Sequence, residues 1–174
     1  LELLKEMNAD HRNKVVINSG RNHQILDKWF KGLNLDFAAE HGMFYKENNK
    51  WHRNITDSVV WDDEILDIIQ HAIDKTPRSY MEQKEASLVW HYRNVDIWLA
   101  ELRSQQLVNA LIGPCARLNL QIVPGNKVVE VKPPDFTKGS EVLRRLAKHD
   151  YDFVLAIGDD TTDDGVAAEK ISVV

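Results

Sequence analysis

The sequence predicts an α/β fold, with a parallel-sheet core and an inserted α+β domain. Near the start, a strand at residues 15–18 is followed by a small-residue turn and a helix, which is a half-unit of a parallel sheet. Near the end, the apolar run at residues 153–157 is bounded by Gly158 and is typical of a strand buried on both faces. More than a hundred residues separate these core strands and carry their own strand and helix patterns, so we expect an insertion.

The core segments lie at both ends of the chain. An amphipathic helix in residues 1–14 precedes the first strand, and the helix after the turn has Ile25, Leu26, Trp29 and Phe30 on its apolar side. The stretch "LDFAAEHG" supplies the next strand, and "TKGSEVLRRLAKH" begins the helix that leads to the last one. The predicted core is therefore discontinuous, covering residues 1–42 and 135–174, and it looks incomplete at both ends.

Residues 43–134 are expected to form the inserted α+β cap domain. Alternating patterns predict a hairpin around Asn48-Asn49, a strand in "ASLVWHYR" and a hairpin turning at Pro124-Gly125. A helix beginning at Asp62 and a long helix over residues 98–116 follow from apolar residues at helical spacing.

Composition excludes several classes of function. The chain has 174 residues, of which 43% are hydrophobic and 28% charged, as in an ordinary globular protein. Its net charge of −5 argues against a nucleic-acid partner or an anionic membrane, both of which demand a basic face. No apolar run approaches the roughly 20 residues of a membrane span. Because Cys115 is alone, no intrachain disulfide can form, and a reducing cytoplasm is expected.

The motif "GDDTTDD" predicts a metal site. Asp159, Asp160 and Asp163 would emerge, with Asp164, at the carboxyl end of a buried strand, where ligands bind in open α/β sheets. Crowded carboxylates repel one another unless a cation lies among them, and Mg²⁺ prefers such oxygen ligands. The alternative is an acidic turn that caps a following helix. A calcium loop of the EF-hand type is excluded because its twelfth position would be Ile171 rather than glutamate.

Two further segments are candidates for binding an anion. Ser19 and Arg21 lie where a strand gives way to a helix, so a hydroxyl, backbone N–H groups and a guanidinium are available to a phosphoryl oxygen. Lys138 opens a helix, where a positive charge is unfavourable to the helix dipole unless an anion binds there. The simpler alternatives are Ser19 as an ordinary N-cap and Lys138 as an exposed surface lysine.

The predicted insertion also carries charged residues on its strands. Glu130 and Lys132 alternate with apolar residues, and His91 and Arg93 end the strand "SLVWHYR". Carboxylates here are suited to accept hydrogen bonds from sugar hydroxyls, although alternation is equally explained by a strand with one face in water. None of the histidines has the spacing of a zinc site.

Taken in order along the chain, these motifs resemble a known family. The stretches "VVINSGRN", "AEHGMF", "SLVWHYR", "VVEVKP" and "AIGDDTTDD" are similar to trehalose-6-phosphate phosphatases of the haloacid dehalogenase-like superfamily, and to the matching domain of trehalose-phosphate synthases. The resemblance spans about residues 13–164, and the combination is far more specific than any single motif.

The resemblance implies an activity and roles for named residues. The enzyme would be a Mg²⁺-dependent phosphatase that hydrolyses trehalose 6-phosphate to trehalose and phosphate through an aspartyl-phosphate. Ser19 would bind the transferring phosphoryl group, with Arg21 nearby, and Lys138 would neutralise its charge. Asp159, Asp160 and Asp163 would bind or orient Mg²⁺, and the cap would contact the sugar through Glu82, Arg93 and Glu130.

The sequence also departs from the family pattern. The family nucleophile belongs to a "DxDGT" motif that these residues do not contain, so we expect its strand to lie outside the given chain. Thr137 stands where the family usually has Asn, and residues 165–174 depart from the expected continuation. Two alternatives therefore stay open: a catalytically silent domain that regulates or scaffolds a fused or associated trehalose-phosphate synthase, and a related phosphatase for another sugar phosphate.

Overall fold

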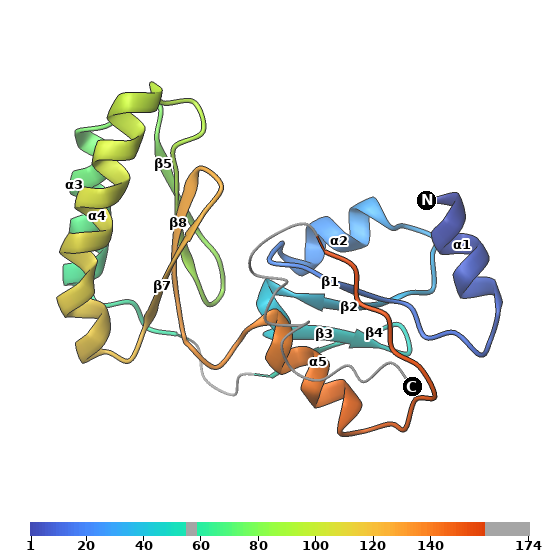
Figure 1. The fold of residues 1–174 in the computed structure, drawn as a ribbon. Coiled ribbons are helices and arrows are strands. Elements are labelled where there is room, and N and C mark those ends of the chain that lie inside the picture. Colours follow the sequence, from blue (N-terminus) through green and yellow to red (C-terminus); the bar gives the residue numbers. More distant parts are fainter. Residues whose placement is uncertain (55–58, 159–174) are drawn as a thin grey trace. The chain divides into compact units, whose positions relative to one another are not determined.

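A computed structural model describes residues 1–54 and 59–158 (Figure 1). The chain forms two compact units: Leu1–Thr56 with Asp135–Val174, and Asp57–Pro134. The inserted unit therefore begins at Asp57, whereas the sequence placed its start at residue 43. The difference arises because the hairpin of Phe44–Glu47 and Lys50–Arg53 pairs with the sheet of the first unit.

The first unit contains a four-stranded mixed sheet. Its strands are ordered β1-β2-β3-β4, with β1 and β2 parallel and the other pairs antiparallel. The predicted strand, turn and helix near the N-terminus are confirmed, because α2 connects β1 to β2 and begins after the N-cap Asn22, whose side chain accepts from the Ile25 amide at 2.9 Å. The elements of this unit are α1 (Glu2–Ala9), β1 (Val16–Asn18), α2 (His23–Trp29), β2 (Asp36–Ala39), η1 (Glu40–Gly42), β3 (Phe44–Glu47), β4 (Lys50–Arg53) and α5 (Lys138–Leu146).

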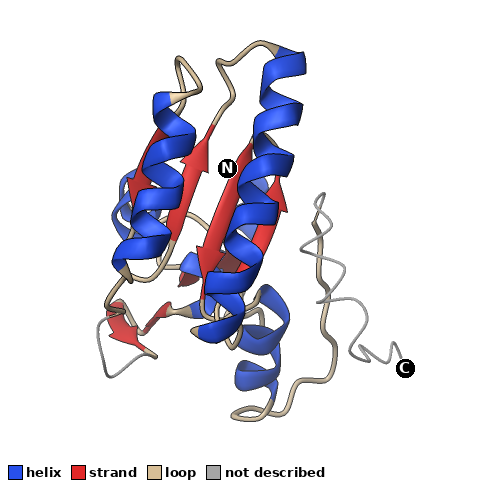
Figure 2. Cartoon of the chain, turned by 90° about the vertical axis from the view of Figure 1, so that its left-hand side faces the viewer, coloured by secondary structure: helices blue, strands red, loops and turns tan. Residues whose placement is uncertain are grey.

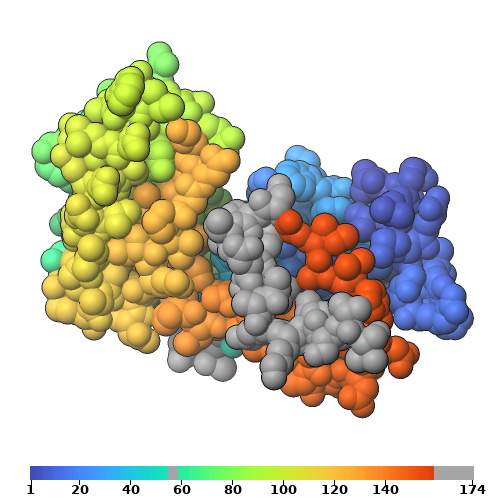
Figure 3. Space-filling view, in the orientation of Figure 1, coloured from blue at the N-terminus to red at the C-terminus, as the bar shows by residue number. Residues whose placement is uncertain are grey.

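The strand predicted at residues 153–157 does not form in the structure. Phe153, Leu155 and Ile157 are 60%, 64% and 89% exposed, and the red-orange atoms of this segment lie at the surface (Figure 3). An apolar run becomes a buried strand only when neighbouring strands supply its backbone hydrogen bonds. In the part of the chain that the structure describes, no strand pairs with this segment, so the prediction of a strand here was wrong.

The short helix η1 requires glycine at its end. Gly42 has a φ of +93°, which side chains rarely adopt, and a Cβ built on it would lie 2.7 Å from Cβ of Glu141 on α5. The close approach lets α5 pack directly against η1. Gly42 therefore combines a left-handed backbone with a contact that leaves no room for a methyl group.

Replacing Gly42 by alanine is expected to lower the free energy of unfolding by about 2 kcal/mol or more, from backbone strain and overpacking together. Gly32→Ala is the matched control, because Gly32 has a φ of +86° but a Cβ added to it would have nothing within 4 Å. Urea denaturation of both variants gives the loss in free energy of unfolding for each. The loss in Gly32→Ala reports backbone strain alone, and the additional loss in Gly42→Ala reports crowding against Glu141. Equal losses would show that the contact with Glu141 contributes nothing.

Asp27 ties α2 to the hairpin of β3 and β4. Its carboxylate accepts from Lys46 Nζ and from Trp51 Nε1, each at 2.7 Å. Burial alone would raise the pKa of Asp27, but these hydrogen bonds outweigh it and hold the pKa below the usual 3.8. A carboxyl whose pKa is lower in the folded state stabilises the protein above its unfolded pKa, and this contribution is lost as the pH falls through the folded pKa.

Asp27→Asn is therefore expected to destabilise the protein at pH 7, with the difference from the wild type vanishing in acid. Thermal unfolding measured between pH 7 and pH 2 tests this. Asp67→Asn, at an exposed aspartate on α3 with no ion pair among the described residues, should change little at any pH. A destabilisation by Asp27→Asn that persists unchanged in acid would contradict the assignment.

The second unit is a four-stranded antiparallel sheet with two helices on one face, as the α+β prediction requires. Its strands are ordered β5-β6-β8-β7, and Figure 2 shows the helices standing in front of the strands. None of the helices in the described residues is both long and apolar enough to cross a bilayer. The elements are α3 (Asp63–Asp74), β5 (Tyr80–Gln83), β6 (Leu88–His91), α4 (Ile97–Arg117), β7 (Gln121–Gly125) and β8 (Val128–Lys132).

The core of this unit lies between the helices and the sheet. Alternate residues of β6 and β8 face the helices, so one side of each strand is apolar while the other is available for polar groups. The buried cluster includes Ile65, Ile69, Leu88, Trp90, Leu107, Leu111, Val129 and Val131.

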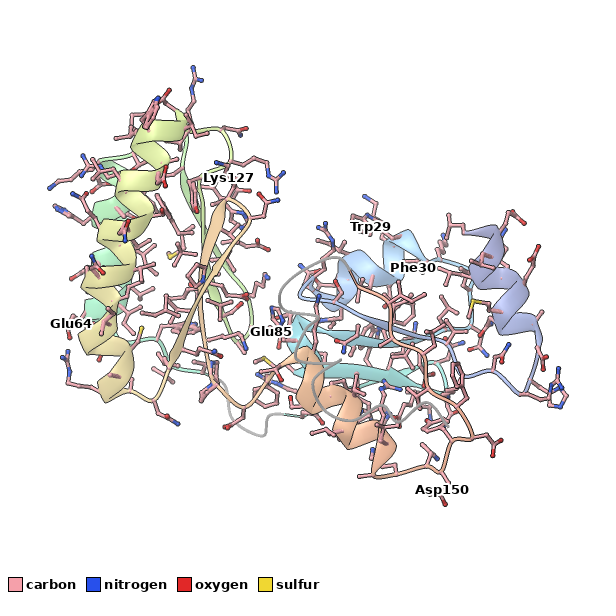
Figure 4. All side chains as sticks on the ribbon, in the orientation of Figure 1. Trp29, Phe30, Glu64, Glu85, Lys127 and Asp150 are labelled. Atoms are coloured by element: carbon pink, nitrogen blue, oxygen red, sulfur yellow. The ribbon has the colours of Figure 1, made fainter. Side chains whose placement is uncertain are left out.

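The hairpin of β7 and β8 turns later than predicted. Pro124 and Gly125 pair with Val129 and Val128 as part of the strand, and the turn is made by Asn126 and Lys127, whose φ is +65°. Lys127 lies at the tip of this hairpin (Figure 4). A proline is tolerated in β7 because β7 is an edge strand, where a missing N–H need not break the sheet.

Candidate functional site

Ser19 lies directly after β1, in a loop that is held against η1. Its amide donates to the Ala38 carbonyl at 2.9 Å, and its carbonyl accepts from the His41 amide at 3.2 Å. The hydroxyl accepts from the Arg21 amide at 3.2 Å. Since the N-cap of α2 is Asn22, Ser19 does not cap that helix, and its hydroxyl lies at the carboxyl end of β1.

Gly20 brings the stretch "AEHG" next to this loop. A Cβ on Gly20 would meet Nε2 of His41 at 2.7 Å, so the absence of a side chain lets the imidazole approach the loop backbone. The Arg21 carbonyl also accepts from the Glu40 amide at 3.0 Å. Two motifs that are separate in the sequence therefore contact each other at this end of the sheet.

Lys138 is brought to the same end of β1. The side-chain amide of Asn18, one residue before Ser19, donates to the Lys138 carbonyl at 2.9 Å, across 120 positions of sequence. Thr137 caps α5 through a reciprocal pair of hydrogen bonds with Ser140, which fixes the start of the helix at Lys138. Sequence reasoning missed Asn18, although a polar amide at the end of the apolar stretch "VVIN" was a visible signal.

A buried ion network holds α5 on the sheet. The guanidinium of Arg145 contacts Glu141 at 2.6 Å and Asp36 at 3.1 Å, and donates to the Phe37 carbonyl at 3.0 Å. Arg145, Glu141 and Asp36 are all buried. Buried charges of this kind are stable only when paired and hydrogen-bonded, so the network fixes the helix that begins at Lys138.

The side chain of Arg21 packs on helix α2 rather than on the Ser19 loop. Its guanidinium lies 4.5 Å above the ring of Trp29, on the exposed side of α2 (Figure 4 labels Trp29). Such stacking leaves the N–H groups at the edge of the guanidinium plane able to bind an anion.

Glu82 and Glu130 share the face of the second sheet that is opposite the helices. In the strand register Glu82 pairs with Val89, which in turn pairs with Glu130, so the two carboxylates stand in one row with Val89 between them. Each has a cationic or polar partner: His91 Nε2 lies 2.8 Å from Glu82, and Lys84 Nζ lies 3.7 Å from Glu130. Sequence reasoning did not predict the pairings made by Lys84 and His91.

Two more charged residues of this unit lie on or beside its strands. Lys132 is 4% exposed, and burial lowers its pKa although the nearby Glu130 opposes this shift. Arg93 follows β6 and donates to the Asn126 carbonyl at 3.5 Å, at the turn between β7 and β8. The structure therefore places Arg93 beside a hairpin turn, while Glu82 and Glu130 stand within the sheet.

The predicted metal ligands Asp159, Asp160 and Asp163 lie outside the described residues. Among residues 1–54 and 59–158, no three histidine, cysteine or carboxylate side chains come together in a way that suits a metal ion.

The relatives found by sequence comparison are proteins of trehalose-phosphate metabolism. The chain is 37% identical over 167 residues to an alpha,alpha-trehalose-phosphate synthase (UDP-forming) B of Dictyostelium discoideum, covering 94% of this chain and 21% of that protein. It is equally 37% identical to a bifunctional trehalose-6-phosphate synthase/phosphatase of Thermoproteus tenax, covering 95% and 23%. The chain thus spans only about a fifth of the length of these curated relatives.

A solved structure and a family model both match this chain to trehalose phosphatases. The C-terminal domain of a trehalose-6-phosphate phosphatase from C. albicans matches with a TM-score of 0.85 and 30% identity, over 95% of this chain and 62% of that one. The family model described as trehalose-phosphatase matches residues 1–169. The chain therefore belongs to the trehalose-phosphatase family and has its haloacid dehalogenase-like α/β fold.

Proposed function

We propose that this chain is part of an enzyme that hydrolyses trehalose 6-phosphate to trehalose and phosphate. The observation that carries the proposal is the hydrogen bond from Asn18, the residue before Ser19, to the backbone carbonyl of Lys138, which holds the start of α5 at the carboxyl end of β1 in a member of the trehalose-phosphatase family. Ligands of open α/β sheets bind at this edge of the strands. A hydroxyl, backbone amides and an ammonium suit a phosphoryl group there.

The chain's own residues have separate tasks in the proposed reaction. The Ser19 hydroxyl would donate to a phosphoryl oxygen, the Lys138 ammonium would offset the charge that develops on the transferring group, and Arg21 would add a second cation. A carboxylate would attack phosphorus while the bond between phosphorus and the sugar oxygen breaks, and trehalose would leave as the protonated alcohol; water would then hydrolyse the acyl phosphate, which releases phosphate and restores the carboxylate. The attacking carboxylate is expected from a "DxDGT" motif, which these 174 residues do not contain.

We propose that Asp159, Asp160 and Asp163 bind or orient Mg²⁺. The support is the chemistry of the donor set, because clustered carboxylates provide the hard oxygen ligands that this ion prefers. When bound, the ion would neutralise charge on the phosphoryl oxygens.

The second unit is proposed to act as a cap that recognises the sugar. Glu82 and Glu130 would accept hydrogen bonds from trehalose hydroxyls, and Arg93 would donate to the substrate. The support is that the two carboxylates share the face of the sheet opposite the helices, where they stand in one row across β5, β6 and β8.

The relatives' names suggest a partner. One matched protein is called a trehalose-phosphate synthase and the other a bifunctional trehalose-6-phosphate synthase/phosphatase, and this chain covers only 21% and 23% of them. We propose that a synthase domain is fused to or associated with this one, in the cytoplasm, where a lone buried thiol such as Cys115 stays reduced. A silent domain that regulates the synthase is the second candidate.

Phosphate release by the full-length natural protein tests the proposal. Trehalose 6-phosphate, glucose 6-phosphate and sucrose 6-phosphate should be compared at equal concentration in the presence of Mg²⁺. Rapid release from trehalose 6-phosphate alone is expected. Preference for another substrate would indicate a related phosphatase, and binding of trehalose 6-phosphate without release would indicate the silent domain.

A further inference from the structure

His91 makes two contacts on the face of the second sheet that is opposite the helices. Its Nε2 lies 2.8 Å from Oε2 of Glu82, and its ring stacks on Tyr80 with centroids 4.7 Å apart and planes 12° apart. The register explains both contacts. Tyr80 pairs directly with His91 across β5 and β6, and Glu82 is two residues further along the same face of β5.

The hydrogen bond defines what each group does. Because a carboxylate only accepts, this contact is assigned as a hydrogen bond from Nε2 of His91 to Glu82. Within residues 1–54 and 59–158, His91 is the one hydrogen-bond partner of the Glu82 side chain. Because a glutamate has three rotatable bonds, an unrestrained carboxylate would lose rotamer freedom when a ligand binds. A stacked imidazole that already holds it reduces this loss.

We propose that His91, braced by Tyr80, is a positioning residue that holds Glu82 ready to accept hydrogen bonds from the hydroxyls of a sugar. The inference rests on the proposed function, because it takes the ligand of this face to be the sugar part of the substrate. The second carboxylate oxygen, Oε1, is the acceptor left for the ligand when Oε2 is engaged by His91. At 36% exposure the Glu82 side chain is accessible, whereas His91 is more covered at 23%.

The same chain offers a matched comparison. Tyr45 and His52 also pair directly across a hairpin, between β3 and β4, and their rings stack with centroids 4.9 Å apart and planes 17° apart. In the described part of the chain His52 makes no hydrogen bond to a carboxylate. Both pairs contain a histidine stacked on a tyrosine, but only His91 is hydrogen-bonded to a glutamate. Replacing His52 therefore controls for the loss of a stacked histidine.

The experiment uses the full-length natural protein with three substitutions: His91→Leu, His91→Gln and His52→Leu. The dissociation constant of trehalose 6-phosphate is measured by calorimetry, and KM, kcat and Tm are measured beside it. His91→Leu should raise Kd and KM by about three- to tenfold, because Glu82 would then lose rotamer freedom when the ligand binds. Its kcat should stay within about twofold, because a sugar contact is equally strong in the ground state and transition state.

His91→Gln should recover most of the affinity, because its amide presents an N–H donor in place of Nε2. His52→Leu should leave Kd, KM and kcat unchanged. A structural role alone would appear as a lower Tm and a smaller active fraction for His91→Leu, with Kd and KM unaltered, and that result would overturn the inference.

The binding and activity readouts also separate this inference from the proposed function. If the wild type binds trehalose 6-phosphate but releases no phosphate, the proposed hydrolysis fails while the order of Kd values still decides the role of His91. If the wild type neither binds nor hydrolyses it, both are overturned.

Discussion

Lys138→Met is expected to slow phosphate release from trehalose 6-phosphate by about 100- to 1,000-fold in kcat, the usual effect of removing one group that stabilises transition-state charge. The lysine lies in the first turn of α5, at the end of β1 where Asn18 holds its carbonyl. Methionine keeps the unbranched shape and good helix propensity while removing the charge. The folded structure should therefore survive, and kcat measured under saturating substrate reports the loss.

Lys148→Met is the matched control for this substitution. Lys148 follows α5, with its ammonium 5.1 Å from the ring of Tyr45, and it has no proposed role in catalysis. Its replacement should leave kcat within about twofold of the wild type. Comparable losses in both variants would show that the effect comes from net charge or from the fold, and Lys138 would lose its assigned role.

Arg145→Met is expected to lower the free energy of unfolding by about 3 kcal/mol or more, because it leaves buried carboxylates without their shared cation. Glu141 keeps Arg144 at 2.7 Å and Asp36 keeps Lys14 at 2.9 Å, but the hydrogen bond to the Phe37 carbonyl is lost as well. Chemical denaturation followed by tryptophan fluorescence measures the change. Activity should fall in parallel, since α5 also carries Lys138.

The control is the same substitution at an exposed ion pair. Arg117 contacts Glu64 on the surface of the other unit, and their side chains are 61% and 53% exposed. Arg117→Met should cost no more than about 1 kcal/mol, as surface pairs usually do. The double variant Glu141→Leu/Arg145→Met should be less damaging than the sum of the two single changes, and strict additivity would contradict a coupled buried network.

Elements with local signals could be predicted from the sequence. Asp62 caps α3 through a hydrogen bond to the Glu64 amide, and the apolar spacing that follows predicted the helix. The Asn48-Asn49 turn also formed as expected, since both residues adopt the positive φ that a tight hairpin requires.

Elements that depend on distant partners were predicted less well. Strand β5 (Tyr80–Gln83) was missed, because its Glu and Gln have little strand preference and its place is set by pairing with β6. For residues 153–157 the error was the opposite one, because a strand was predicted that does not form. Their apolar pattern indicates a preference for burial, but a strand also needs a neighbouring strand to accept and donate its backbone hydrogen bonds. For the hairpin of β7 and β8, Pro124-Gly125 predicted a turn, but both residues belong to β7, because an edge strand tolerates proline and glycine.

The candidate site shows the same division. The order of Ser19, Lys138 and the acidic cluster was visible in the sequence, whereas the contact through Asn18 spans 120 positions and had to come from the fold. Glu82 and Glu130 were named by resemblance, and the strand register then placed them in one row. The contact of His91 with Glu82 could not be predicted, because it is set by cross-strand pairing rather than by spacing along the chain.

The most direct test is phosphate release from trehalose 6-phosphate by the full-length natural protein, measured with Mg²⁺ and again after chelation. We expect release that depends on the metal and is nearly abolished by Lys138→Met. Binding of the sugar phosphate without any release under either condition would contradict the proposed hydrolysis, and would assign the domain to regulation of a synthase.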